Sequence, residues 1–381
     1  MQPSLIRQRL LRDSRPALQR LLARHAFWDE DAQKLIIDLT PFHAGLMPVS
    51  LPGWEQLVGW QGRAPELPDW PLLNWPAQPA VQRWRRHIPQ WVEDTLLRLP
   101  RSHQLKLLYL SARYPQMLEL LEKMPVLAWR IAASGMDEQT LRTLFPKPRT
   151  FINASVGWPA ERAALRFLQR LRLRRMDEEM IAQVETCLNE PNTLHRSVEL
   201  PRINSMALTL AANFPDLVAT PLHHSLARQP CRPEQCRQMH ALIEDALKLA
   251  KWLDKDITPI QNARFLVEIE DLYSQWLAEA MEKGINWTRK NTDLAKIGET
   301  PSDWHQLSER ELDESIAVSA HAFFIEHSEG ARLFRHAQHP IVVALMPDGT
   351  LVARTSHNRL PTPEQQACIA LFKAKLMQTN G

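Results

Sequence analysis

The chain has 381 residues, of which 44% are hydrophobic and 23% are charged, and its formal net charge is +3. These values are typical of globular proteins with a buried core, and the length is enough for two or three domains. They exclude a polyelectrolyte, so any surface that binds nucleic acid has to be a local basic patch.

The sequence also limits the expected cellular setting. It has no apolar run long enough to span a membrane, and its Arg-rich first 24 residues lack the apolar core of a secretory signal. Four cysteines are too few for a disulfide framework in a chain of this length. We therefore expect a reduced, cytoplasmic protein that has no membrane partner.

Glycine is scarce and proline is common, with 11 and 29 residues, which predicts short helices separated by joints that contain proline. Residues 4–25 form the first predicted helix, interrupted at Pro16. Leucines supply its apolar stripe, and arginines crowd its other faces. These arginines are either a solvated face or a contact for phosphate or an acidic partner.

Residues 41–91 combine six tryptophans with repeated prolines. Because proline lacks a backbone donor and restricts the residue before it, this composition predicts an extended loop. The indoles either pin that loop onto the helical body or form a base-stacking platform together with the basic run 83–87. The spacing of Val81, Trp84 and Ile88 indicates that Trp84 faces a core.

Apolar residues recur at helical spacing from 102 to 196, and Pro115 and Pro125 are predicted to begin new helices. Two longer helices are expected at 233–253 and 259–283.

The most concentrated basic patch lies on a helix predicted over 159–175. Its leucines at 165, 168 and 171 should face inward, and only Glu161 opposes its positive charge before Asp177. The candidate nucleic-acid-binding residues are Arg162, Arg166 and Arg170, spaced four apart on one face, and Arg172, Arg174 and Arg175, which follow. The alternative is a face that is solvated or paired with carboxylates inside the protein.

Two groups of residues could carry metal or catalytic chemistry. Cys231, Cys236 and His240 offer zinc ligands, but the Cys-x4-Cys spacing is looser than that of common zinc sites, so we expect no metal and no cofactor. His321 and Glu314 are the candidates for a general acid or base. They lie near a His-rich stretch that contains His321, His327, His336, His339 and His357.

Common catalytic motifs are missing from the sequence. It contains no Gly-x-Gly-x-x-Gly, no phosphate-binding loop, no Gly-x-Ser-x-Gly and no His-Glu-x-x-His. Their absence argues against the common nucleotide-dependent and hydrolytic enzyme classes.

A β-hairpin is predicted near the C-terminus. Residues 341–346 and 350–355 are rich in β-branched and apolar residues, and Pro347-Asp348-Gly349 separates them. Gly349 should have a positive φ in the turn, because glycine adopts that conformation without strain.

Residues 304–376 resemble the PcfJ-like family, whose genes lie on conjugative plasmids, phages and bacterial chromosomes. The match rests on Leu312-Asp313-Glu314-Ser315, on Gly330-Ala331-Arg332-Leu333-Phe334, on the hairpin, and on Asn358 and Pro361. Where the family has an adjacent His-Cys pair, this chain has Ala320-His321, so chemistry carried by that pair would be missing here. The resemblance implies a small α+β domain.

These observations predict a mostly α protein with a small C-terminal α+β domain. The expected parts are an N-terminal helix with the Trp/Pro-rich segment (1–100), an all-helical domain (101–300) and the α+β domain (301–381). The leading function is a non-enzymatic binding or adaptor protein of a bacterial mobile-element or defence setting that engages DNA or RNA. The alternatives are a nucleic-acid-processing enzyme with a site near His321, and a helical scaffold that binds a protein encoded nearby.

Overall fold

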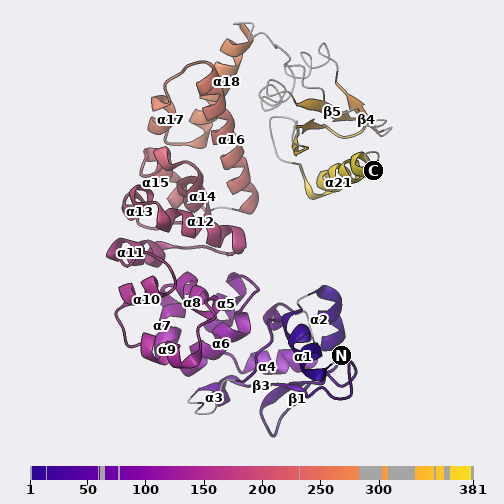
Figure 1. The fold of residues 1–381 in the computed structure, drawn as a ribbon. Coiled ribbons are helices and arrows are strands. Elements are labelled where there is room, and N and C mark those ends of the chain that lie inside the picture. The colour runs from indigo at the N-terminus through magenta and orange to yellow at the C-terminus, as the bar shows by residue number, and fades with distance from the viewer. Residues whose placement is uncertain are drawn as a thin grey trace. The chain divides into compact units, whose positions relative to one another are not determined.

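The computed structural model describes residues 2–13, 15–58, 60, 65–75, 78–230, 232–282, 303–307, 331–346, 349–355 and 361–378. These residues form two compact units, Met1–Val218 and Ala219–Gly381. The boundary lies inside the segment 101–300, which the sequence analysis treats as one helical domain. The protein is mostly α-helical and has a small C-terminal α+β region, as predicted (Figure 1).

Proline begins many of the helices, because its fixed φ suits the first helical turn and its missing N–H has no partner there anyway. Pro115 and Pro125 each begin a helix, as the sequence predicts, and Pro16 divides the first predicted helix in two. The helices of the first unit are α1 (Pro3–Arg12), α2 (Pro16–Ala23), α3 (Trp54–Leu57), η1 (Leu72–Asn74), α4 (Pro79–Arg86), α5 (Gln90–Arg98), α6 (Gln104–Arg113), α7 (Pro115–Lys123), α8 (Pro125–Ala133), α9 (Glu138–Leu144), α10 (Arg149–Ser155), α11 (Arg162–Arg170), α12 (Glu178–Asn189), α13 (Pro191–Ser197), α14 (Ser205–Asn213) and η2 (Pro215–Leu217).

An antiparallel sheet near the N-terminus is a feature that the sequence analysis did not predict. Its strands β1 (Ala26–Asp29), β2 (Lys34–Ile37) and β3 (Val49–Pro52) are ordered β1-β2-β3. Gln33 has a φ of 49° in the turn between β1 and β2, so the left-handed residue of this turn is not a glycine. That choice removes the usual sequence signal for a hairpin.

Three of the six tryptophans of residues 41–91, Trp70, Trp75 and Trp84, are buried in the core, which supports the first of the two predicted roles. Trp70 and Trp84 are 1% and 2% exposed, and their indole N–H groups donate to the backbone oxygens of Leu10 and Pro52. Trp91 differs, since it is 43% exposed. The segment is not one extended loop, because it contains β3, α3, η1 and α4.

The second unit begins with helices and ends with the α+β region. Its helices are α15 (Pro221–Arg228), α16 (Pro233–Trp252), α17 (Thr258–Asn262), α18 (Leu266–Glu282) and α21 (Pro363–Gln378). The single helix predicted over 259–283 is in fact α17 and α18, with residues 263–265 between them.

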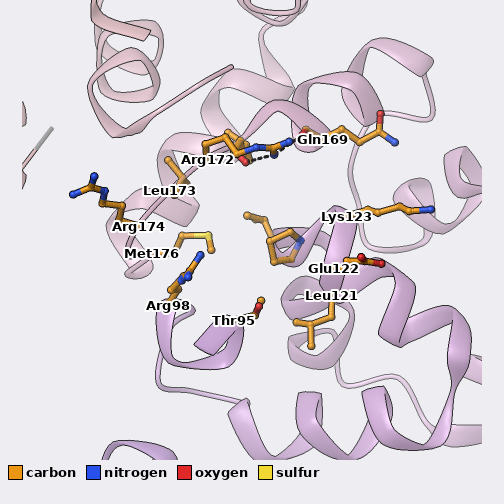
Figure 2. Close-up of a pocket in the computed structure, with 13 residues that line it drawn as sticks. Thr95, Arg98, Leu121, Glu122, Lys123, Gln169, Arg172, Leu173, Arg174 and Met176 are labelled. Atoms are coloured by element: carbon orange, nitrogen blue, oxygen red, sulfur yellow. Dashed lines mark hydrogen bonds between the residues drawn. The ribbon is translucent and has the colours of Figure 1, made fainter. Parts of the chain in front are cut away.

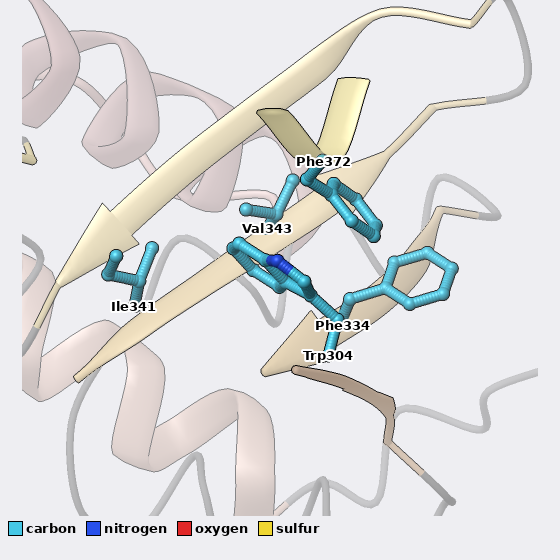
Figure 3. Packing of buried hydrophobic residues seen from close by; sticks show 5 residues of the cluster. All are labelled: Trp304, Phe334, Ile341, Val343 and Phe372. Carbon is cyan, nitrogen blue, oxygen red and sulfur yellow. The ribbon is translucent and has the colours of Figure 1, made fainter. Parts of the chain in front are cut away.

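The predicted hairpin is confirmed. Strands β4 (Trp304–Gln306), β5 (Arg332–His336), β6 (Ile341–Leu345) and β7 (Leu351–Thr355) form an antiparallel sheet in the order β4-β5-β6-β7. Gly349 has a φ of 83°, and its N–H donates to the backbone oxygen of Met346 at 2.9 Å. Side chains of this sheet and of α21 form a buried cluster, shown in Figure 3: Trp304, Phe334, Ile341, Val343 and Phe372.

Candidate functional site

Helix α11 presents arginines to solvent on the side opposite its buried residues, while Leu165, which was predicted to face inward, is half-buried. Phe167 and Leu168 are buried with exposed fractions of 0% and 1%, whereas Arg162 and Arg166 are exposed. Arg170 is half-buried, and its Nη1 donates to the backbone oxygen of Leu200 at 2.8 Å. The three arginines predicted to share one face therefore differ, since one of them also holds the backbone of a neighbouring segment.

The helix ends at Arg170, five residues before the predicted end. From there the chain is extended, and buried Leu171 and Leu173 alternate with exposed Arg172 and Arg174. This period of two is the signature of an extended chain with one buried side. Arg172, Arg174 and Arg175 therefore lie outside the helix, on what we call the extended segment (residues 171–176).

Backbone hydrogen bonds hold the extended segment at both ends. The N–H of Arg172 donates to the oxygen of Ile203, and the N–H of Ile203 donates to the oxygen of Arg170, each at 2.8 Å. At the far end, the N–H of Met176 donates to the oxygen of Arg98 at 2.6 Å. The segment is thereby fixed against the C-terminal end of α5.

A pocket of about 580 Å³ opens beside the extended segment (Figure 2). It is bounded by α5, by the junction of α7 and α8, and by the end of α11. Its lining residues are Thr95, Arg98, Leu121, Glu122, Lys123, Pro125, Val126, Gln169, Leu171, Arg172, Leu173, Arg174 and Met176. We call this the basic pocket.

Cations outnumber anions around the basic pocket. Arg98, Lys123, Arg172 and Arg174 line it, and Glu122 is the carboxylate among its lining residues. In Figure 2, Arg98 and Arg174 lie on one side and Lys123 lies on the opposite side. Because cations stand on both sides of the opening, their positive electrostatic potentials add over the space between them.

The partners of these cations differ in kind. Nζ of Lys123 lies 3.2 Å from Oε1 of Glu119, so part of its charge is already neutralised. Nη1 of Arg172 donates to the backbone oxygens of Gln169 and Leu171 at 2.7 and 2.8 Å, which leaves its charge unpaired. Within the described part of the chain, no salt bridge joins a carboxylate to any of the six arginines predicted from the sequence.

A second cavity, of about 650 Å³, shares Met176 with the basic pocket. Arg175 lines this cavity and not the basic pocket, and Asp177, Glu178 and Glu179 line it as well. Met176 lines both cavities. The acidic neighbours make the second cavity a poorer place for an anion than the basic pocket.

Sequence reasoning missed Arg98 and Lys123. Each is the last residue of its helix, α5 or α7, and only tertiary packing brings them to the extended segment. For the segment itself a signal was present, since Leu171-Arg172-Leu173-Arg174 alternates strictly between apolar and charged residues.

The other predicted sites are placed as follows. His321, Glu314 and Cys231 lie outside the described residues. Cys236 is buried on α16, and Nδ1 of His240, one turn later, lies 3.8 Å from Oε2 of Glu244. Among the helices of the described ranges, none has both the length and the apolar composition that a bilayer span requires.

In comparisons with protein-family models, curated proteins and solved structures, nothing matches this chain. The resemblance to the PcfJ-like family therefore stays a prediction from the sequence.

Proposed function

We propose that the protein is a non-enzymatic binding protein that engages nucleic acid at the basic pocket, with the exposed arginines of α11 extending the contact. The observation that carries the proposal is the set of cations around one opening, of which Arg98, Arg172 and Arg174 have no carboxylate partner among the described residues. The mobile-element or defence setting rests on the PcfJ-like resemblance alone.

The charge pattern favours a polyanion over a single small anion. Arg162 and Arg166 are exposed on α11, and Arg172 and Arg174 continue the positive charge along the segment that follows. A chain of phosphates can meet such a row at several points, and each contact releases counterions. The overall charge of +3 is too small to bind a chain of phosphates without a local concentration of arginine.

The floor of the basic pocket is apolar, which favours a nucleotide over an isolated phosphate. Leu121, Val126, Leu171, Leu173 and Met176 line it between the cations. Its volume of about 580 Å³ falls within the usual range of small-ligand pockets, roughly 300–1,000 Å³. An unpaired base could occupy the apolar floor while its phosphates meet the arginines, so single-stranded nucleic acid fits better than duplex.

Fluorescence anisotropy with labelled single-stranded and duplex oligonucleotides of mixed sequence tests this proposal. The test variant is Arg98→Gln/Arg172→Gln/Arg174→Gln, in which all three exposed side chains lose their charge. We expect binding of the single strand to weaken at least tenfold at low salt. The slope of log Kd against log salt should fall by about two units, since each lost phosphate contact removes roughly 0.7.

A matched control removes three arginines that are already paired. In Arg83→Gln/Arg142→Gln/Arg149→Gln the net charge changes by the same amount, but the lost cations lie 3.7, 4.0 and 2.7 Å from carboxylates of Glu30, Glu138 and Glu119. This control should bind nearly as well as the wild type. An equal loss in both variants, or a wild-type protein that binds neither oligonucleotide at low salt, would overturn the proposal and favour a protein-binding scaffold.

A further inference from the structure

Three residues with metal-binding side chains meet in the α+β region. His336 is the last residue of β5, His339 lies in the connection to β6, and Cys368 lies on α21. Their ligand atoms all lie within 4.8 Å of one another. His336 is buried, and His339 and Cys368 are half-buried, so the group is reachable from solvent on one side.

Packing of the hydrophobic cluster brings these residues together. The ring of Phe372 stacks on Trp304 with centroids 4.4 Å apart, and Trp304 meets the His336 ring edge-on at 4.9 Å. Cys368 precedes Phe372 by four residues on α21, so the two lie on the same helix face. Cys368 accordingly packs against the cluster, beside the end of β5.

The donor set suits a divalent ion of intermediate softness. Two imidazoles and one thiolate are ligands that zinc accepts, and with three protein ligands one tetrahedral position stays open for water or another ligand. In a formed site the ligand atoms would stand roughly 3.4–3.6 Å apart, from the usual Zn–N and Zn–S lengths. The group therefore has to contract by about an ångström to hold an ion.

One ligand is already engaged in hydrogen bonds. Nδ1 of His336 accepts from the backbone N–H groups of Gln338 and His339 at 3.1 and 3.2 Å. These bonds fix the ring, and they place the proton of the neutral imidazole on Nε2. An ion at Nδ1 has to displace these two N–H groups, and an ion at Nε2 needs the ring proton to move to Nδ1, where the same two hydrogen bonds would be lost.

We propose that His336, His339 and Cys368 form a binding site for one transition-metal ion of the Zn²⁺ type. The site belongs to the second unit and does not depend on the proposed function of the basic pocket. It differs from the group of Cys231, Cys236 and His240 considered from the sequence, and it combines two members of the His-rich stretch with a cysteine from the last helix.

Cobalt titration of the full chain, stripped of metal with a chelator, tests the site at neutral pH. Co²⁺ reports thiolate ligation through a near-ultraviolet charge-transfer band, and added Zn²⁺ should remove that band by displacement. We expect one Co²⁺ per chain with this band, its loss in Cys368→Ser, and at least tenfold weaker binding in His339→Ala. Zn²⁺ should also protect Cys368 from alkylation, as read by mass spectrometry of the labelled peptide.

The matched control is Cys236→Ala/His240→Ala, which removes the same ligand types from α16. Its cobalt spectrum should equal that of the wild type. Thermal unfolding of each metal-free variant checks that it is folded, so a lost band reports lost ligands. A wild-type chain that binds no Co²⁺, a band that survives Cys368→Ser, or a band lost in the control would each overturn the proposal.

Discussion

Helix α11 and the extended segment after it carry three arginines each, yet the two elements present them differently. In the helix, apolar residues recur every three or four positions, so exposed Arg162 and Arg166 stand one turn apart above a buried face. From Leu171 to Arg174, every second side chain is buried, so Arg172 and Arg174 are aligned along one edge and line a pocket. The backbone period, more than the charge, decides whether arginines cover a surface or surround an opening.

The largest expected loss of stability comes from truncating a buried leucine that holds the extended segment in place. Leu173 is 6% exposed, and Leu173→Ala should lower the free energy of unfolding by about 2–5 kcal/mol, because it leaves a cavity under the segment. The exposed neighbour Gln169 offers the control, since Gln169→Ala should change stability by less than about 0.5 kcal/mol. Urea unfolding measures both. Equal, small effects would show that the segment is not anchored by its leucines.

A smaller loss of stability is expected at high pH. It arises from Cys187 on α12, the helix that follows the extended segment. Burial raises the pKa of the Cys187 thiol to about 12 from an ordinary value of 9.0. Above pH 9 the unfolded chain loses this proton while the folded chain keeps it, so stability falls as pH rises from 9 towards 12. The loss should be about 1.4 kcal/mol per pH unit in that window, and this thiol adds no pH dependence well below pH 9.

Urea unfolding at pH 8 and pH 10 measures this effect, with Cys187→Ala as the reference variant. The substitution removes the titrating group, so the variant should lose less stability between the two pH values than the wild type does. If both proteins lose the same amount of stability, water reaches the Cys187 thiol more readily than its burial on α12 implies.

The smallest expected changes in stability come from replacing the arginines of α11, and they should differ from one arginine to another. Arg170→Gln should cost about 1 kcal/mol, because its guanidinium donates to the backbone oxygen of Leu200. Arg162→Gln and Arg166→Gln should stay within about 0.5 kcal/mol, since both side chains are exposed. Thermal unfolding of the three single variants measures the difference. Equal melting temperatures would show that the hydrogen bond of Arg170 adds no stability.

The parts of the fold that could be predicted are those that single residues mark in the sequence. Pro115 and Pro125 begin helices because of the geometry of their own rings, and Gly349 marks its turn because of its own conformational freedom. The turn after β1 gave no such signal, because Gln33 takes the left-handed conformation without being a glycine. The N-terminal sheet was therefore missed.

Sites formed by distant segments could not be read from the sequence. The arginines of the extended segment were found because they are neighbours in the chain, whereas Arg98 and Lys123 reach the basic pocket only through helix packing. In the same way, His336 and His339 were visible within a His-rich stretch, but nothing local connects them with Cys368 on α21. The spacing of residues along the chain indicates which side chains share a face of one helix or strand. It does not indicate which faces of distant elements pack together.

Met176 gives the two cavities beside the extended segment a common boundary. Met176 lines both the basic pocket and the cavity with Asp177, Glu178 and Glu179. A thioether is flexible and adapts its shape to its neighbours. An occupant of one cavity that shifts Met176 would change the lining of the other, so molecules in the two cavities would influence each other's binding without touching.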